Sequence, residues 1–412
     1  MTQAFSDMLY LFSCAVHGIK PDNNPDYSLN EIYMNAMRQG ILPLVLVAMD
    51  DLDLDGETLI SYTPLRHHLD NLRMMAISNM RSNNIVYNAI KQLNENGFCC
   101  CVLKGATIAD LYSNKNFRIS MDTDVYIDAD NKKVIKKAIK VFEEHGFVFS
   151  GIPPHTNHYI AQHEAAGILE LHYNLYHELF ADVWFDNKTA LAEPFRIVKT
   201  HLNLEIPTLG VTDGYIYMCL HIVKHFLAEG TGIRPIMDFL LYTKCYKEEI
   251  DYRRFSEIMH YLKFNKFVDL MMCIGVKHLG FSKEDLCPFD CDEATADEVL
   301  LDIEGGGLFG HDEEWRKGFS MVYNEQRFKR FKDDDYAEFM KTWEFKRKIH
   351  SGYVMRQRYP YVAKYRFLLP VAWIHRIVTY VIRSIFNKSK ATDKLDERVR
   401  ARLDLIQELD MI

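Results

Sequence analysis

The chain has 412 residues, of which 48% are apolar and 13% aromatic, so it can bury a large core and is not generally disordered. Its formal net charge of −8 argues against a uniformly basic nucleic-acid-binding protein, and nucleic acid is not the favoured partner. The N-terminus lacks the basic flank and cleavage signal of a secretory leader, and no long apolar run predicts a membrane span, so we expect a cytoplasmic protein.

The hydrophobic pattern divides the chain into four expected regions. Apolar residues at helical spacing before Gly40 indicate a helical beginning. From about residue 205 onward the pattern is helical again, and no strand-like alternation persists. The regions are an N-terminal helical region (1–75), a mixed α/β core (76–205), a helical domain (206–340), and a basic aromatic segment with a C-terminal helix (341–412).

The core carries the strand-like segments. Short apolar or alternating runs predict strands at 98–103, 121–127, 147–149 and 167–174. Amphipathic runs predict helices at 76–96, 106–112 and 130–145. The order of these elements predicts an α+β fold, in which a small mixed sheet is flanked by N-terminal and C-terminal helical regions.

Two aspartates stand two residues apart on the strand predicted at 121–127. Because side chains alternate along a strand, Asp122 and Asp124 point to the same face, roughly 6–7 Å apart. Glu170 can join them from a neighbouring strand. Three such carboxylates can hold Mg²⁺ (or Mn²⁺) ions for in-line phosphoryl or nucleotidyl transfer. The alternative is a solvated strand edge, which is common for an Asp-x-Asp pair in an acidic chain.

A turn near this strand favours the catalytic interpretation. The apolar run at 98–103 ends in Lys104-Gly105 and is followed by a helix, so backbone amides there can approach a triphosphate. Arg118 precedes the acidic strand and can bind a phosphate, although a salt bridge to a nearby acid is the alternative. Lys104, Gly105 and Arg118 are therefore the candidate nucleotide-binding residues.

Several short motifs follow one another in an order that is typical of a known family. They are Val102-Leu103-Lys104-Gly105, Leu111-Tyr112, Arg118, Asp122-Thr123-Asp124-Val125, Gly146-Phe147, Leu169-Glu170-Leu171-His172, His221-Ile222-Val223-Lys224-His225 and Gly232-Ile233-Arg234-Pro235-Ile236-Met237-Asp238. Over about residues 28–245, this pattern resembles the uncharacterised nucleotidyltransferase family of the DNA polymerase beta-like superfamily.

The resemblance implies a nucleotidyltransferase domain over the core at 76–205. Lys104 and Gly105 take the place of the superfamily's phosphate-binding turn. Ala106 departs from the pattern, because it replaces a hydroxyl or a second glycine there. The metal ligands and catalytic residues that the resemblance implies are Asp122, Asp124 and Glu170.

Further polar side chains are candidates for the acceptor pocket. The irregular spacing of the histidines before 167–174 argues against a structural zinc site, and a surface loop is the alternative for them. Arg234 and Asp238 lie four residues apart in the helical domain, so a helix salt bridge is the alternative for this pair. The acceptor-pocket candidates are His158, His172, His225, Arg234 and Asp238.

The segment 341–390 differs in charge from the rest of the chain. It contains 12 Lys or Arg residues and one acid, a net of +11, so the remainder carries −19. Its basic, aromatic and apolar residues suit peripheral contact with an anionic membrane surface. A nucleic acid or acidic polymer is a second interpretation, and packing on the chain's own acidic body is a third.

Nine cysteines are present, and we expect them to be reduced thiols. Their number is odd, and several lie in apolar runs, which is typical of buried thiols in an intracellular protein. Cys287 and Cys291 lack a matching second ligand pair, so no zinc site is expected there.

The leading hypothesis is a metal-dependent nucleotidyltransferase. It would move a nucleoside monophosphate from a nucleoside triphosphate, with ATP among the candidates, to a small-molecule, glycan or protein acceptor. The alternative is a non-catalytic nucleotide-binding or scaffold protein on the same fold. Three like charges on one small sheet cost stability unless a cation or solvent offsets them, which favours the first hypothesis. The sequence selects neither the base nor the acceptor, and it leaves the oligomeric state open.

Overall fold

A computed structural model gives the structure of the chain in two compact units. The larger unit comprises Met1–Gly151, Asn157–Glu313 and Leu409–Met411, and the smaller comprises Ile152–Thr156, Glu314–Glu408 and Ile412. The described strands and the candidate site all belong to the larger unit. The structure describes residues 1–52, 67–68, 71–120, 122–129, 132–150, 158–175, 191–228, 230–307, 316, 361, 368–372, 374–375 and 391–411.

The described elements alternate between helices and short strands only in the middle of the chain. The helices are α1 (Gln3–His17), α2 (Leu29–Arg38), α3 (Leu42–Asp50), α6 (Leu72–Glu95), α7 (Ala106–Ala109), α8 (Lys132–Glu144), α11 (Val211–Leu227), α12 (Ile233–Tyr246), α13 (Tyr252–Leu262), α14 (Asn265–His278), α15 (Glu293–Gly306) and α21 (Ala391–Glu408), with 3₁₀ turns η1 (Lys115–Phe117) and η2 (Lys283–Asp285). The strands are β1 (Cys99–Val102), β2 (Asp122–Asp128), β3 (Val148–Phe149), β4 (His158–His163), β5 (Gly167–His172), β6 (Arg196–Lys199) and β7 (Glu205–Thr208).

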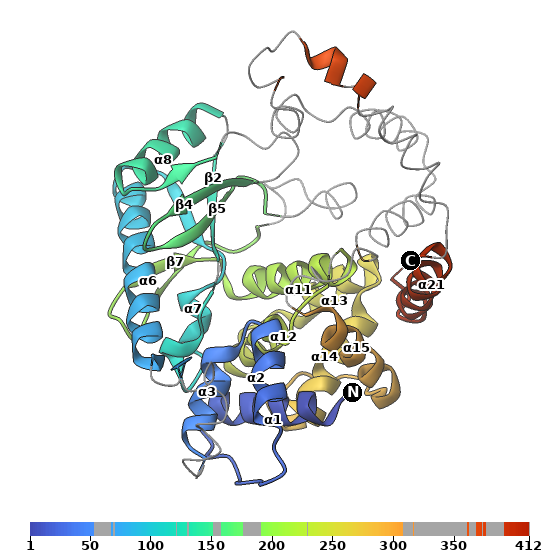
Figure 1. Ribbon diagram of the computed structural model, residues 1–412. Coiled ribbons are helices and arrows are strands. Elements are labelled where there is room, and N and C mark those ends of the chain that lie inside the picture. Colours follow the sequence, from blue (N-terminus) through green and yellow to red (C-terminus); the bar gives the residue numbers. More distant parts are fainter. Residues whose placement is uncertain are drawn as a thin grey trace. The chain divides into compact units, whose positions relative to one another are not determined.

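The seven strands form one mixed sheet in the order β3-β4-β5-β2-β1-β7-β6. The pairs β2–β5 and β1–β7 are parallel, and the other neighbours are antiparallel. In Figure 1, α6 and α8 lie along one side of the sheet, and the helices of the α11–α15 region and of α1–α3 complete the larger unit. The predicted α+β class is confirmed.

The alternation of side chains gives the sheet one apolar face and one polar face. Val125 and Ile127 on β2, with Leu169 and Leu171 on β5, are buried in a core with residues of α6 and α8. The residues between them on the same strands therefore point to the opposite face. That face carries the predicted carboxylates, and α11 packs near it.

Three strands of the sheet were missing from the prediction, and one of them is β6, for which no element was predicted. The histidine-rich stretch expected to be a loop forms β4, which pairs with β5 through a short turn and buries Tyr159 and Ala161. Residues 205–208 form β7, although a helical pattern was expected from about 205. All three strands are short, and long-range pairing stabilises them more than any local pattern, which explains the errors.

The helical regions at the two ends of the larger unit are joined by buried contacts. Gln39, between α2 and α3, is 1% exposed. Its Nε2 donates to Ile303 O at 2.9 Å, and its Oε1 accepts from Ile233 N at 3.1 Å. Among the helices that follow the sheet, Tyr215 of α11 stacks on Phe239 of α12, with 4.5 Å between the ring centroids. The N-terminal helices therefore pack directly on the helices that follow the sheet.

One cysteine pair departs from the expected reduced state. Cys273 and Cys291 form a disulfide, with 5.2 Å between their Cα atoms. α14 carries Cys273, and Cys291 lies just before α15, so the packing of these neighbouring helices brings the pair together. The other seven cysteines are free, and Cys99 and Cys245 among them are exposed rather than buried.

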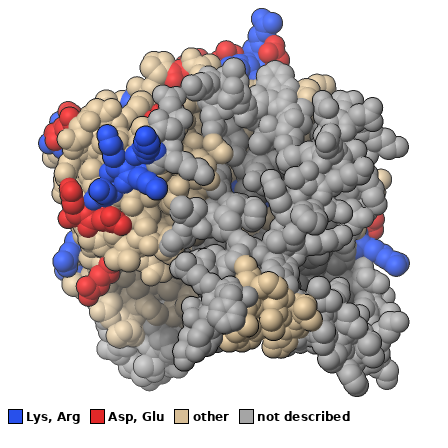
Figure 2. Space-filling view, turned by 90° about the horizontal axis from the view of Figure 1, so that it is seen from above, with Lys and Arg blue, Asp and Glu red and all other residues tan. Residues whose placement is uncertain are grey.

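The solvent face of α8 is basic. In Figure 2, Lys and Arg side chains gather over this helix, beside a group of acidic side chains. The opposite side of α8 buries Ile135, Ala138 and Phe142. This surface is therefore on the far side of the sheet from the predicted carboxylates. The exposed lysines are Lys133, Lys136, Lys137 and Lys140.

The basic segment predicted at 341–390 lies mostly outside the described residues. Its membrane, nucleic-acid and packing interpretations therefore stay predictions. Among the helices that the structure describes, none has both the length and the apolar character needed to cross a membrane.

Candidate functional site

Three carboxylates meet on the polar face of the sheet. β2 supplies Asp122 and Asp124, and Glu170 lies on β5 directly opposite Asp124 in the parallel register. One carboxylate oxygen from each lies within 4.8 Å of the others. Hard divalent cations such as Mg²⁺ prefer oxygen donors, so this donor set fits such an ion. The alternation of side chains along β2 and β5 thus produces the carboxylate cluster that the sequence predicted.

The carboxylate of Asp124 is buried between Lys104 and His172. Its Oδ2 lies 2.8 Å from Lys104 Nζ, and its Oδ1 accepts from His172 Nε2 at 3.3 Å. Burial raises the pKa of Asp124, but the charge of Lys104 and the hydrogen bond from His172 outweigh it, and the pKa falls well below its usual range. Burial lowers the pKa of His172, but its bonds to Asp124 and Glu170 leave the pKa raised. Asp124 is therefore an anion that Lys104 and His172 stabilise.

Glu170 lies between two histidines. Its Oε2 is 3.4 Å from His172 Nε2 and 3.6 Å from His158 Nε2. Burial raises the pKa of Glu170, but the hydrogen bond from His172 helps to bring it below its usual value. Burial lowers the pKa of His158 to about 4, so this imidazole is neutral at pH 7. The site therefore offers nitrogen as well as oxygen donors.

One face of α11 supplies further polar groups to this region. Lys104 Nζ donates to His221 Nε2 at 3.1 Å, and His225 lies one turn farther along, with 4.5 Å between the two rings. Burial lowers the pKa of Lys224, while the charges of Glu170 and Asp124 oppose the shift, so this lysine interacts electrostatically with the carboxylates. The sequence analysis did not select Lys224. Its position three residues after His221 was the available signal.

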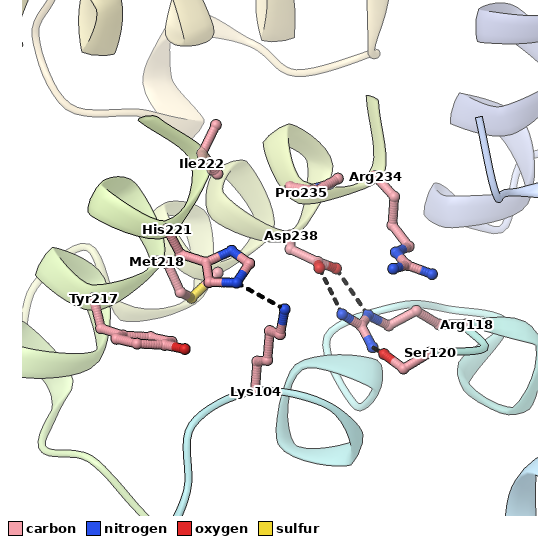
Figure 3. Close-up of a pocket in the computed structure, with 10 residues that line it drawn as sticks. All are labelled: Lys104, Arg118, Ser120, Tyr217, Met218, His221, Ile222, Arg234, Pro235 and Asp238. Atoms are coloured by element: carbon pink, nitrogen blue, oxygen red, sulfur yellow. Dashed lines mark hydrogen bonds and ion pairs between the residues drawn. The ribbon is translucent and has the colours of Figure 1, made fainter. Parts of the chain in front are cut away.

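A small pocket lies beside the carboxylates. Figure 3 shows that its lining comes from the end of β1, the loop before β2, α11 and α12. Lys104 lines the pocket and also contacts Asp124, so the pocket and the cluster share a wall. The lining residues are Lys104, Arg118, Ser120, Tyr217, Met218, His221, Ile222, Arg234, Pro235 and Asp238.

Arg118 and Asp238 form a buried ion pair in the wall of this pocket. Arg118 donates Nε to Asp238 Oδ1 at 2.8 Å and Nη2 to Oδ2 at 2.6 Å, in a bidentate arrangement that Figure 3 draws. Tyr112 Oη donates to the same carboxylate at 2.6 Å. Asp238 thus pairs with Arg118 rather than with Arg234. The salt bridge named as the alternative for Arg118 is present.

Arg234 uses only part of its guanidinium in bonds within the chain. Its Nη1 donates to Ile119 O, and its buried Nε has no hydrogen-bond partner among the described residues. A buried donor without a partner is costly unless a ligand or water satisfies it. Arg234 therefore has hydrogen-bonding capacity left for an anionic ligand in the pocket.

The predicted phosphate turn is partly occupied by the chain itself. Gly105 has a φ of 108°, which a residue with a side chain rarely adopts, and the four-residue helix α7 begins after it. The Ala106 amide donates to Tyr87 Oη at 3.1 Å. Arg118 Nη1 donates to the Gly105 carbonyl at 3.3 Å. These two hydrogen bonds fix the turn, and the Ala106 amide is therefore not available to a ligand in the pocket.

The structure brings most of the predicted site residues together, although in two groups. Asp122, Asp124, Glu170, His158 and His172 form one group on the sheet. Lys104 joins this group to the pocket, where Arg118, Arg234 and Asp238 lie; His225 contacts His221 nearby.

His163 has a structural role instead. Its Nδ1 accepts from the amides of Ala165 and Ala166 at the β4–β5 turn. His155, which belongs to the same histidine-rich stretch, lies outside the described residues.

A mixed sheet with clustered carboxylates on one face, beside a cationic pocket, is the arrangement expected of a nucleotidyltransferase fold. Residues 27–280 match the family described as "Uncharacterised nucleotidyltransferase", and the chain belongs to this family. No curated protein and no solved structure matches the chain. The family description supports nucleotidyl transfer in general terms.

Proposed function

We propose that the protein transfers a nucleoside monophosphate from a nucleoside triphosphate to an acceptor, with Mg²⁺ or Mn²⁺ bound at the carboxylates. The observation that carries this proposal is the cluster of Asp122, Asp124 and Glu170, whose oxygens lie within 4.8 Å of one another. Family membership supports the same chemistry. The acceptor is a small molecule, a glycan or a protein side chain.

The cationic groups near the cluster suit a triphosphate. Lys104 and Arg234 line the pocket, and Lys224 lies near the carboxylates on α11. Together they can neutralise the charge of the phosphates and of the leaving pyrophosphate. Arg118 is committed to Asp238, so we assign it a positioning role: it holds the Gly105 carbonyl and thereby the turn.

In the proposed reaction, an acceptor oxygen attacks the α-phosphorus, a new P–O bond forms, and the bond to the bridging oxygen breaks to release pyrophosphate. A divalent cation at the cluster would supply charge stabilisation for the attacking and leaving oxygens. Asp122 can take the acceptor's proton, because its carboxylate makes no ion pair or hydrogen bond among the described residues, whereas the carboxylate of Asp124 is held by Lys104 and His172.

Thermal unfolding with Mg²⁺ and each nucleoside triphosphate tests this proposal. A ligand present at 100 times its Kd adds about 2.7 kcal/mol to the free energy of unfolding, so the midpoint should rise by several degrees with the true donor. Asp122→Asn should abolish this rise and the release of pyrophosphate from the same mixture.

Asp128→Asn is a matched control, since Asp128 lies on the same strand and the same face but is exposed at its far end. It should behave like the wild type. Pyrophosphate release by Asp122→Asn at the wild-type rate would refute the catalytic role of the cluster.

The alternative is a non-catalytic nucleotide-binding protein on the same fold. The bond between the Ala106 amide and Tyr87 favours it, because this amide would otherwise be available to a phosphate. A nucleotide-dependent rise in the midpoint without pyrophosphate release, in the wild type and with a range of acceptors, would select this alternative.

A further inference from the structure

His158 and His172 face each other across the β4–β5 pair. They are direct partners in the antiparallel register, and their ring centroids lie 4.8 Å apart. Glu170 lies two residues before His172 on β5, so its side chain is on the same face. One donor atom from each of the three residues lies within 4.8 Å of the other two.

The contacts of His172 with the two carboxylates are long for hydrogen bonds. His172 Nε2 can carry one proton, yet it faces Asp124 Oδ1 at 3.3 Å and Glu170 Oε2 at 3.4 Å. Both distances exceed the usual range for a bond to a charged acceptor, which is about 2.7–2.9 Å. His158 Nε2 is 3.6 Å from the same Glu170 oxygen. These donor atoms converge without making short bonds to one another.

The spacing instead matches the donors of a metal ion. In a tetrahedral zinc site with ligand bonds of about 2.0–2.2 Å, neighbouring donor atoms lie about 3.3–3.6 Å apart. The separations from His172 Nε2 to Asp124 and Glu170, and from His158 Nε2 to Glu170, fall in this range. His172 Nδ1 is buried without a hydrogen-bond partner among the described residues, so the Nε2 contacts orient the ring.

We propose that His158, Glu170 and His172 form a second metal site, which binds a zinc-type transition metal. Asp124 or a water completes the coordination. Imidazole nitrogen suits Zn²⁺ and related ions, whereas Mg²⁺ prefers oxygen, so this site differs in metal preference from the carboxylate cluster. Glu170 belongs to both donor sets. The proposal goes beyond nucleotidyl transfer, since it concerns metal binding in the absence of any nucleotide.

Titration with Co²⁺, followed by visible absorption, tests the site in the full-length protein. The wild type should give the intense band of four-coordinate cobalt, and excess Mg²⁺ should not remove it. His158→Gln should weaken Co²⁺ binding at least about tenfold and lose the band. Asp122→Asn should keep the band, because Asp122 is outside this donor set. His260→Gln, which changes an exposed histidine on α13, is the matched control and should behave like the wild type.

A second variant gives a positive signal. His158→Cys replaces the imidazole with a thiolate, which also binds zinc-type ions, and should add a sulfur-to-cobalt charge-transfer band that the wild type lacks. The proposal is overturned if His158→Gln binds Co²⁺ like the wild type, or if His158→Cys adds no band.

A band lost in Asp122→Asn but kept in His158→Gln also overturns the proposal, since the ion would then lie on the carboxylates. None of these results depends on nucleotide binding, so a failure here leaves the proposed transfer reaction separately testable.

Discussion

Asp238 is a buried carboxylate whose charge is balanced by one guanidinium. Burial raises the pKa of Asp238, but the charge and hydrogen bonds of Arg118 outweigh it, and the pKa is lowered. Tyr112 adds a third hydrogen bond to the same group. A buried ion pair of this kind contributes little net stability. The loss of one partner, however, leaves a buried charge without compensation.

Asp238→Asn should therefore lower the free energy of unfolding at pH 7 by about 3–5 kcal/mol. Urea denaturation of the two proteins measures the difference. Asp297→Asn, which alters a more exposed ion pair on α15, should cost about 1 kcal/mol or less. A loss of similar size in both variants would contradict the role assigned to the buried pair.

The same pair gives a pH dependence with a definite sign. Because the pKa of Asp238 is lower in the folded chain than the value of about 3.9 expected in the unfolded chain, its stabilisation is full above that value. It is lost as the pH falls below about 4. The difference between wild type and Asp238→Asn should therefore shrink below pH 4 and stay constant from pH 5 to 7.

The sequence could predict some spatial relations between the site residues but not others. The spacing of Asp122 and Asp124 fixes their common face, because a strand has a two-residue period. Glu170 could be offered as a third carboxylate from another strand, but periodicity does not say which strands are neighbours, so its place beside Asp124 followed from the sheet. The Arg118–Asp238 pair joins residues 120 positions apart, and no local pattern indicates it.

At the scale of elements, α11 contributes more to the site than its pattern indicates. Its apolar residues, such as Ile222 and Val223, are buried, whereas His221 and Lys224 are half-buried on the side that meets Lys104 and the carboxylates. Burial lowers the pKa of Lys224, with the charges of Glu170 and Asp124 acting against the shift. A cation in this position can bind the phosphates of a donor nucleotide.

Lys224→Met should weaken the binding of inorganic tripolyphosphate with Mg²⁺ by about tenfold or more, since a hydrogen bond to a charged group contributes about 1.5–3 kcal/mol. Isothermal titration measures the affinity without a choice of base. Lys136→Met, on the exposed face of α8, should leave it unchanged. Equal affinities for Lys224→Met and the wild type would exclude the role proposed for Lys224.

The sheet illustrates what local patterns can and cannot predict. β1, β2 and β5 were predicted within one or two residues, because each has a clear apolar or alternating run. β4 contains three polar residues in six, two of them histidines, and its partner β5 stabilises it. Its assignment as a loop left out the strand pairing that brings His158 opposite His172 and close to Glu170.

At the scale of the larger unit, Gln39 connects regions that are far apart in the sequence. Its side-chain amide accepts a hydrogen bond from the amide of Ile233, the first residue of α12, and donates one to the carbonyl of Ile303 on α15. The side chain is almost fully buried. Neither backbone group has access to water as a replacement. The N-terminal helices are thus part of the same folded unit as the helices after the sheet.

Gln39→Leu should lower the free energy of unfolding by about 1–3 kcal/mol for each of the two backbone groups that lose a partner. Chemical denaturation, with Gln3→Leu at an exposed position of α1 as control, measures the change. A cost below 1 kcal/mol would mean that this contact does not stabilise the packing of the two regions.

The residues that match the family begin at 27 and end at 280, yet two helices beyond those limits are deeply packed. α1 buries Phe5 and Phe12 completely and rests on α3 and α14, while α15 buries Val299 and Leu300 against α14. The segment that matches the family and the packed helical unit therefore have different limits in this chain. A chain trimmed to residues 27–280 would therefore expose two apolar surfaces, one where α1 packs on α3 and α14 and one where α15 packs on α14.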